Sequence, residues 1–267
     1  MLKKQILLTN DDGIRSPGLW AAAEALSAIG YVTVAAPREQ SSAMSRSMPI
    51  TSDGIISEEM VHVNGQDWQV YAVGGSPAQS VQHGILRILD LKPDLVVSGI
   101  NYGENLAYGT GVSGTVGAVM EGASLGVPGL AVSVETKKEH HLSYSDEVDF
   151  SVAAYFTALF AKKILEKKFP PEVKVLKVDV PSDADKKTPW QMTRLSPNLY
   201  YRPIANREAS WEKPYALDYE VGANLEIEPN DTDVYTMHKN REVSVTPLSL
   251  DFSARVDLQE FSEFLRK

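Results

Sequence analysis

The chain contains no cysteine among its 267 residues, so disulfide bonds and thiolate-bound metals are excluded. Any metal must be bound by oxygen or imidazole ligands, which favours magnesium or manganese over structural zinc. The sequence also lacks an apolar run near the roughly 20 residues of a membrane-spanning helix. Because Met1-Leu2-Lys3-Lys4 leads directly into an expected strand, we predict no signal peptide, no membrane association and a cytoplasmic protein.

Positive charge is also scarce: 26 Lys and Arg stand against 35 Asp and Glu, a formal net charge of −9. Binding to duplex nucleic acid generally needs a basic surface, so we predict no such partner. Three motifs are absent as well. The chain has no Gly-Lys-Ser/Thr of a P-loop, no G-x-G-x-x-G after its first strand and no G-x-S-x-G elbow. These absences argue against P-loop NTPases, dinucleotide-dependent dehydrogenases and serine hydrolases.

Helix and strand patterns alternate over about the first 180 residues. Continuous apolar runs such as 31–36 and 95–100 are typical of strands that are buried on both faces of a parallel sheet. Helices are expected between the strands, the last of them over 148–168, and further strands are expected over 173–180 and 243–248. This order predicts a doubly wound α/β fold.

Turn signals sharpen this prediction. Ser16-Pro17 and Ser76-Pro77 each indicate a helix start, with serine as the N-cap and proline at the first helical position. Asn64-Gly65 predicts the turn of a β-hairpin. The region 182–240 has polar and aromatic residues without a clear period, so no element is assigned there. A short helix is predicted over 258–265.

The first strand ends in two adjacent carboxylates, Asp11 and Asp12, preceded by Asn10 and followed by a glycine. Ligands bind at the carboxyl ends of strands in open parallel sheets, so the pair indicates a divalent-cation site. A turn cap is one alternative. An aspartyl-phosphate phosphatase is another, but its nucleophile would stand at Asn10, and asparagine cannot serve as one. A water molecule activated by a metal is the better candidate.

Neutral oxygen ligands for such a cation are expected from two other loops. Asn101 follows the end of a second strand, and Ser42 lies in a serine-rich loop after a third. Oxygen ligands of this kind suit a hard cation. Each residue alone would be an ordinary turn residue, and only the convergent topology gives the pair weight.

The sequence Ser113-Gly114-Thr115 follows a glycine-rich loop and opens a helix. Free backbone N–H groups, the helix dipole and two hydroxyls are typical of a phosphate site, although an N-cap alone explains the pattern equally well. The five histidines show no ligand spacing, and His140-His141 is interpreted as solvated surface.

Several long motifs, which together reach to about position 251, occur in the order and spacing of one known family: Ile6–Gly13, Ser16–Gly18, Gly75–Ala78, Val97–Leu106, Ser113–Val116, Glu121-Gly122, Lys177–Pro181, Val243–Leu248 and Asp251. With these motifs the chain resembles the SurE family, the survival proteins that act as metal-dependent nucleoside-monophosphate phosphatases.

The resemblance implies a Rossmann-like three-layer α/β/α sandwich with a mainly parallel sheet. It implies Mn²⁺ or Mg²⁺ held by residues that match Asp11, Asp12, Ser42 and Asn101. It also implies hydrolysis of nucleoside 5′- and 3′-monophosphates, and of short polyphosphate in some members. Members form dimers or tetramers that exchange C-terminal segments. We therefore expect a homodimer or homotetramer.

The domain prediction follows from the same resemblance. We expect one SurE-like domain over 1–267, in which 1–181 form the α/β core and 182–267 form an irregular extension with an exchanged hairpin and helix. The chain departs from the family pattern in the loop Pro37–Ser42, where Ser41 competes with the metal serine. Asp179 replaces the family's asparagine, which is expected to alter a structural hydrogen bond. Residues 198–235 match weakly.

We therefore predict a phosphomonoesterase that hydrolyses nucleoside monophosphates with a metal-activated water. The catalytic residues are Asp11 and Asp12, and Asp11 is the carboxylate expected to orient or deprotonate the water. The phosphoryl oxygens are expected to contact Asn105, Ser113, Gly114 and Thr115. A non-catalytic nucleotide- or metal-binding regulator on the same fold is the alternative. A sugar-nucleotide transferase would need an acceptor site that no motif indicates.

Overall fold

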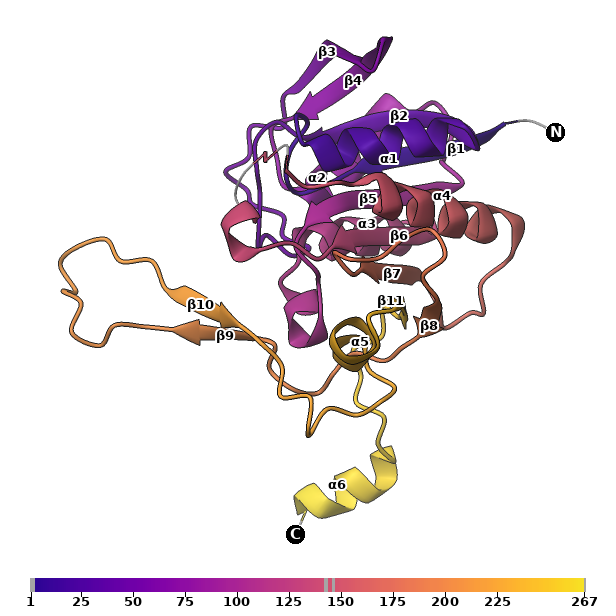
Figure 1. The fold of residues 1–267 in the computed structure, drawn as a ribbon. Coiled ribbons are helices and arrows are strands. Elements are labelled where there is room, and N and C mark those ends of the chain that lie inside the picture. The colour runs from indigo at the N-terminus through magenta and orange to yellow at the C-terminus, as the bar shows by residue number, and fades with distance from the viewer. Residues whose placement is uncertain (1–2, 142–143, 146, 267) are drawn as a thin grey trace.

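The computed structural model describes residues 3–141, 144–145 and 147–266. One sheet runs through the centre in the order β3-β4-β2-β1-β5-β6-β7-β11-β8 (Figure 1). Its strands are β1 Lys4–Thr9, β2 Gly30–Pro37, β3 Ile56–Val63, β4 Gln66–Val73, β5 Leu95–Tyr102, β6 Gly129–Val134, β7 Val175–Val180, β8 Trp190–Met192 and β11 Val243–Leu248. Neighbouring strands from β4 to β7 are parallel, whereas β3 and β11 run antiparallel to β4 and β7.

Helices cover both faces of this sheet. The helices α1 (Pro17–Ser27) and α4 (Ser151–Glu166) pack on one face, and α2 (Pro77–His83) and α3 (Gly114–Ser124) on the other. The centre of β1 is apolar on both faces because Leu8 packs in the core cluster on one side of the sheet and Leu7 in the cluster on the other. The three layers confirm the predicted α/β/α fold.

The turn signals give the local structure that they predict, with some corrections. Ser76 accepts a hydrogen bond from the Gln79 amide in a capping box, while Ser16 occupies its N-cap position without a side-chain cap bond. Asn64 and Gly65 have φ values of 48° and 79°, as a hairpin turn between twisted strands requires. The helix expected over 148–168 is shorter, and a π-helix (Gly84–Ile88) follows α2.

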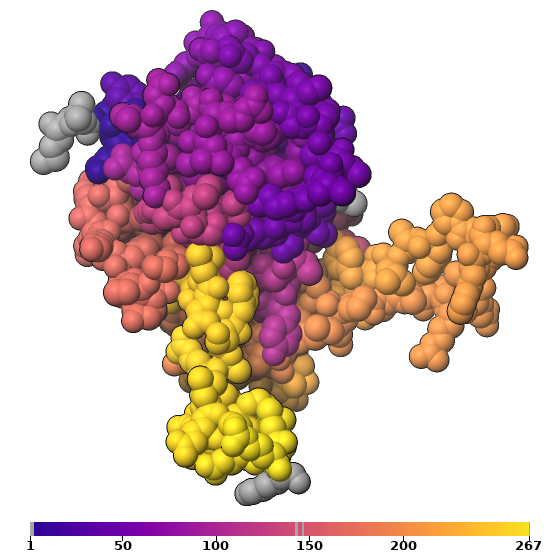
Figure 2. Space-filling model, turned by 180° about the vertical axis from the view of Figure 1, so that it is seen from behind, coloured from indigo at the N-terminus to yellow at the C-terminus, as the bar shows by residue number. Residues whose placement is uncertain are grey.

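The C-terminal third leaves the core and returns to it. A separate hairpin of β9 (Tyr201–Ile204) and β10 (Asp218–Val221) projects away from the core, as does α6 (Leu258–Arg266) (Figure 1). Between them lie α5 (Asp233–Tyr235), a π-helix (Thr236–Asn240) and β11. Seen from behind, the segment between β11 and α6 lies against the core, and α6 extends beyond it (Figure 2). Within the described residues, every helix is too short or too polar to span a bilayer.

Candidate active site

A tight turn at the end of β1 brings two carboxylates into the protein. Asn10 forms this turn: its Oδ1 accepts from the Gly13 amide at 3.1 Å and its Nδ2 donates to the Gly13 carbonyl at 3.0 Å. Gly13 has φ +96°, which is strained for any residue with a Cβ atom. The turn lets two adjacent side chains, Asp11 and Asp12, both be buried, with exposed fractions of 4% and 1%.

Asp11 lies against the N-terminus of α3. Its Oδ1 accepts a 2.5 Å hydrogen bond from the Thr115 hydroxyl. Burial raises the pKa of Asp11 to about 6, against the lowering effect of Thr115 and of the Gly114 backbone. A Cβ atom at position 114 would stand 2.8 Å from Asp11 Oδ2, so this approach needs glycine. The residues predicted from β1 and from the glycine-rich loop are therefore in contact.

Asp12 is held by weaker contacts. Its Oδ1 accepts from Gln40 Nε2 at 3.3 Å and its Oδ2 from the Tyr102 amide at 3.4 Å. Burial and the neighbouring Asp11 charge raise the pKa of Asp12. Among the described residues, no ion pair involves either aspartate. Two buried carboxylates with neutral partners make a centre of unbalanced negative charge, and a divalent cation fits such a centre.

The remaining ligands for such a cation must be neutral, because the described residues contain no group of three or more His, Asp or Glu side chains that could hold a metal. The loop after β2 contacts the turn that carries Asp11 and Asp12, because the Ser41 amide donates to the Asp11 carbonyl at 2.7 Å. The Ser41 hydroxyl points back to the Glu39 carbonyl, whereas the adjacent Ser42 is exposed.

Asn101 lies within β5, not beyond its end, since this strand continues to Tyr102. Its Nδ2 donates to the carbonyls of Tyr102 and Gly103 at 3.3 and 2.7 Å. These bonds leave the amide oxygen as the atom of Asn101 that can bind a cation.

The two other predicted phosphate ligands are held firmly. Ser113 is the N-cap of α3, and its Oγ accepts from the Val116 amide at 3.1 Å, so the hydroxyl proton remains for a ligand. Asn105 is buried, and its Nδ2 donates to Ser133 Oγ at 2.8 Å. One N–H of that amide therefore remains for a phosphoryl oxygen.

A polar wall beside Asp12 was not predicted from the sequence. Gln40 Nε2 also donates to the His141 carbonyl at 3.1 Å, and His141 Nδ1 lies 2.9 Å from the Tyr219 hydroxyl. The hydroxyl of Tyr144 donates to the Asp12 carbonyl at 2.7 Å. His141 is half-buried and burial lowers its pKa, so the interpretation of His140-His141 as solvated surface is wrong. The hairpin residue Tyr219 lies 78 positions further along the chain, beyond any local sequence signal.

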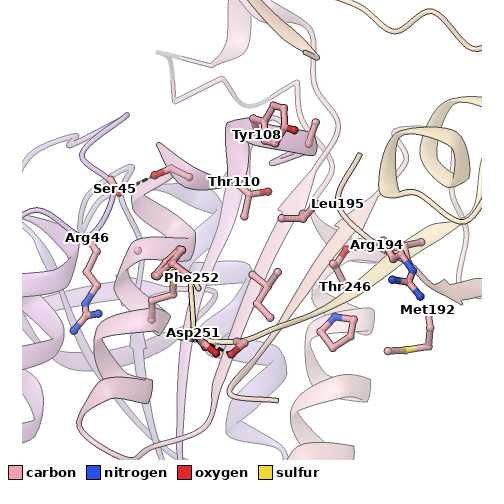
Figure 3. Close-up of a pocket in the computed structure, with 18 of the residues that line it drawn as sticks. Ser45, Arg46, Tyr108, Thr110, Met192, Arg194, Leu195, Thr246, Asp251 and Phe252 are labelled. Atoms are coloured by element: carbon pink, nitrogen blue, oxygen red, sulfur yellow. Dashed lines mark hydrogen bonds between the residues drawn. The ribbon is translucent and has the colours of Figure 1, made fainter. Parts of the chain in front are cut away.

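A large open cavity of about 1020 Å³ is bordered by residues of the glycine-rich loop, among them Tyr108 and Thr110. Figure 3 shows Arg46 on one side of it, Arg194 on the other and Phe252 from the C-terminal segment between them. The Nε of Arg46 donates to the buried Glu121 at 2.6 Å. The cavity includes neither Asp11 nor Asp12 in its lining, so the carboxylate pair is a distinct feature.

Comparisons with known proteins agree with this architecture. A family model described as Survival protein SurE matches residues 6–202. The chain belongs to the SurE family. One relative is a protein from Methanocella arvoryzae that is named 5′-nucleotidase SurE. It is 38% identical to this chain, over 98% of both chains. Another of that name, from Thermococcus gammatolerans, is 41% identical over 98% of this chain and 96% of its own.

A solved structure of a SurE protein has the same fold as this chain. The SurE protein from Aquifex aeolicus superposes with a TM-score of 0.74 and 31% sequence identity, over 98% of this chain and all of the other. The family predicted from the motifs is thereby confirmed.

Proposed function

We propose that the protein is a divalent-metal-dependent phosphomonoesterase that hydrolyses nucleoside 5′-monophosphates and also 3′-monophosphates. The observation that carries the proposal is the buried pair Asp11 and Asp12, whose described partners are all neutral. The name 5′-nucleotidase, which the relatives carry, supports a nucleotide as the substrate.

The cation of this proposal is Mn²⁺ or Mg²⁺, held by Asp11, Asp12, Ser42 and Asn101. When bound, it would lower the pKa of a water molecule and neutralise phosphate charge. Asp11 orients the attacking water or accepts its proton, and the hydrogen bond from Thr115 fixes its carboxylate in place.

The phosphoryl group would lie at the N-terminus of α3, where backbone N–H groups favour negative charge. The proposed donors there are the Ser113 hydroxyl and the remaining N–H of Asn105, together with the amides of Gly114 and Thr115, which the phosphate would share with the Asp11 carboxylate. The Thr115 hydroxyl donates to Asp11, so Thr115 would contact the phosphate only through its backbone amide, which Asp11 also uses. The carboxylate, the cation and the substrate would thus share one helix end.

Phosphate release from AMP, GMP, 3′-AMP and tripolyphosphate, with Mn²⁺, Mg²⁺ or a chelator, tests this function. We expect release from AMP and GMP that requires the metal, and slower release from 3′-AMP. Binding of AMP without any release would instead identify the non-catalytic regulator. Release that continues undiminished in chelator would overturn the metal dependence.

The assembly that we propose is a homodimer or homotetramer formed through the C-terminal extension. The helix α6 supports it, because its apolar side chains Leu258, Phe261, Phe264 and Leu265 are 48–79% exposed. Apolar faces of this kind mark interaction surfaces. A sizing column with light scattering separates the two assemblies, and a monomer at micromolar concentration would refute both.

A further inference from the structure

A buried ion network joins the core to the C-terminal extension. Lys177 and Asp179 stand two residues apart on β7 and therefore point to the same face. The Nζ of Lys177 donates to Asp179 Oδ2 at 2.5 Å and to Asp233 Oδ2, at the start of α5, at 3.1 Å. All three side chains are fully buried. One ammonium group thus serves as the counter-charge shared by two carboxylates.

Both carboxylates also hold the backbone of one loop. Asp179 Oδ1 accepts from the Asn105 amide at 2.7 Å, and Asp233 Oδ2 accepts from the Ala107 amide at 3.0 Å. Leu106, between them, is buried in an apolar cluster with Val234 of the extension. Three successive residues of the loop that we propose to bind phosphate are therefore held: Asn105 and Ala107 by hydrogen bonds to the network, and Leu106 by packing in the cluster with Val234.

Two further observations indicate that this attachment sets the loop's conformation. Ala107 has φ +52°, a left-handed conformation that residues with a Cβ atom adopt only when their surroundings impose it. Asn105 is also held from its other side, because the Thr110 hydroxyl donates to its carbonyl at 3.0 Å and its own Nδ2 donates to Ser133. Every polar backbone group of Asn105 is thus engaged.

We propose that Lys177, Asp179 and Asp233 are positioning residues for phosphate binding: the network fixes Asn105 and ties its placement to the C-terminal extension. This inference rests on the proposed function. It differs from a purely structural staple, which would stabilise the fold without changing the affinity of the folded protein for phosphate.

The decisive variant is Asp179→Asn, which removes a charge, keeps the shape and places the asparagine of the family pattern beside Lys177 of this chain. If the new amide oxygen faces the Asn105 N–H, its NH₂ group faces the ammonium of Lys177. If the amide is reversed, the NH₂ group faces the Asn105 N–H instead. One of the two contacts is lost in either case. We expect a roughly tenfold rise in the KM for AMP and in the inhibition constant of inorganic phosphate, with a smaller change in kcat.

Ser244→Ala is the matched control. Ser244 faces Asp179 across the β7–β11 ladder, is fully buried and shares a 2.8 Å hydrogen bond with Thr193. Among the residues that the structure describes, the Ser244 hydroxyl makes no hydrogen bond to the phosphate loop, so its loss should lower the melting temperature and leave KM unchanged. A second variant, Asp233→Asn, keeps the ion pair of Lys177 and Asp179, whose charges cancel, and weakens the contact to the Ala107 amide. It should reproduce the rise in KM.

Amide hydrogen exchange gives a readout that does not depend on turnover. Exchange at Asn105 should accelerate in Asp179→Asn, and exchange at Ala107 in Asp233→Asn, while Ser244→Ala changes neither. Wild-type KM and phosphate affinity in both folded Asp variants would overturn the proposal. If the wild type binds phosphate but releases none from AMP, the hydrolytic function fails, and the phosphate affinities of the variants still decide the role of the network.

Discussion

Asp11 with Asp12 and Asp179 with Asp233 are two pairs of buried carboxylates with opposite electrostatic arrangements. Lys177 lies between the members of the second pair and bonds to both. The first pair has only neutral partners among the described residues. Since a buried charge without a counter-charge is costly, the first pair marks a place where a ligand completes the structure, and the second a place that has a counter-charge within the protein.

One stretch of chain connects the two pairs. Asn105, near its beginning, donates to Asp179, and Thr115, at its end, donates to Asp11. The compensated pair thus fixes one end of the loop, and the uncompensated pair lies at the other. The presence of a buried counter-charge, rather than burial alone, therefore distinguishes the structural acids from the candidate catalytic ones in this protein.

The most severe way to break this comparison is Asp11→Asn. We expect kcat for AMP with Mn²⁺ to fall by a factor on the order of 10³ or more, because the cation and the water lose their main carboxylate. The fold should persist, since the substitution removes an uncompensated buried charge. Phosphate release and thermal unfolding measure the two effects. Asp149→Asn, at an exposed acid, is the control and should remain active. Near wild-type turnover in Asp11→Asn would refute the assignment.

Lys177→Met breaks the compensated pair. It leaves Asp179 and Asp233 facing each other without a counter-ion, so the free energy of unfolding should fall by about 3–5 kcal/mol. Urea denaturation measures this loss. Lys162→Met, at an exposed residue that pairs with Glu166 along α4, should change stability by less than about 0.5 kcal/mol. A similar small change for Lys177→Met would mean that the network is not compensated as described.

Binding of a divalent cation would supply the counter-charge that Asp11 and Asp12 lack, and its effect on stability tests the same comparison. Mn²⁺ or Mg²⁺ at 100 times its dissociation constant should stabilise the wild type by about 2.7 kcal/mol, and a chelator should reverse the effect. Asp12→Asn should abolish most of this stabilisation, whereas Lys177→Met should retain it in whatever fraction folds. Melting curves at several cation concentrations test both statements, and equal shifts in wild type and Asp12→Asn would contradict them.

The smallest effect belongs to a half-buried ion pair at the end of β6. Burial alone would raise the pKa of Glu135, but hydrogen bonds from Arg241 and Ser182 outweigh it and lower the pKa to about 2. A lowered pKa contributes stability above the unfolded value of about 4.5, and this contribution is lost as the pH falls toward 2. Glu135→Gln should therefore cost about 1 kcal/mol at pH 7 and progressively less between pH 4.5 and 3. A cost that does not vary with pH in denaturant titrations would refute this cause.

Much of the core could be predicted from the sequence, because its signals are local. The run Ile6–Leu8 is apolar at every position since helices cover both faces of the sheet, and parallel strands bring their carboxyl ends to one edge. Asp11 and Thr115, 104 residues apart, could therefore be predicted to lie near each other. The Asn64-Gly65 turn is likewise a local signal.

The rest depends on contacts that no local pattern encodes. Lys177 and Asp233 lie 56 residues apart, and only the altered residue Asp179 drew attention to their surroundings. The strands β9 and β10 are short and mostly exposed, so their sequences show no alternation of apolar and polar residues. The family, the fold and the proposed ligands were accessible from motifs, whereas the wall around His141 was not.

The position of β11 has a consequence for biosynthesis. This strand pairs with β7 and β8 in the main sheet although it ends only at Leu248. Asp233, which holds the Ala107 amide, also belongs to this late part of the chain. During translation the sheet therefore stays open at β7 until β11 has left the ribosome. A chain that stops before Asp233 would present the carboxylates of β1 without the bond that holds Ala107, so the site is assembled only after this segment has been made.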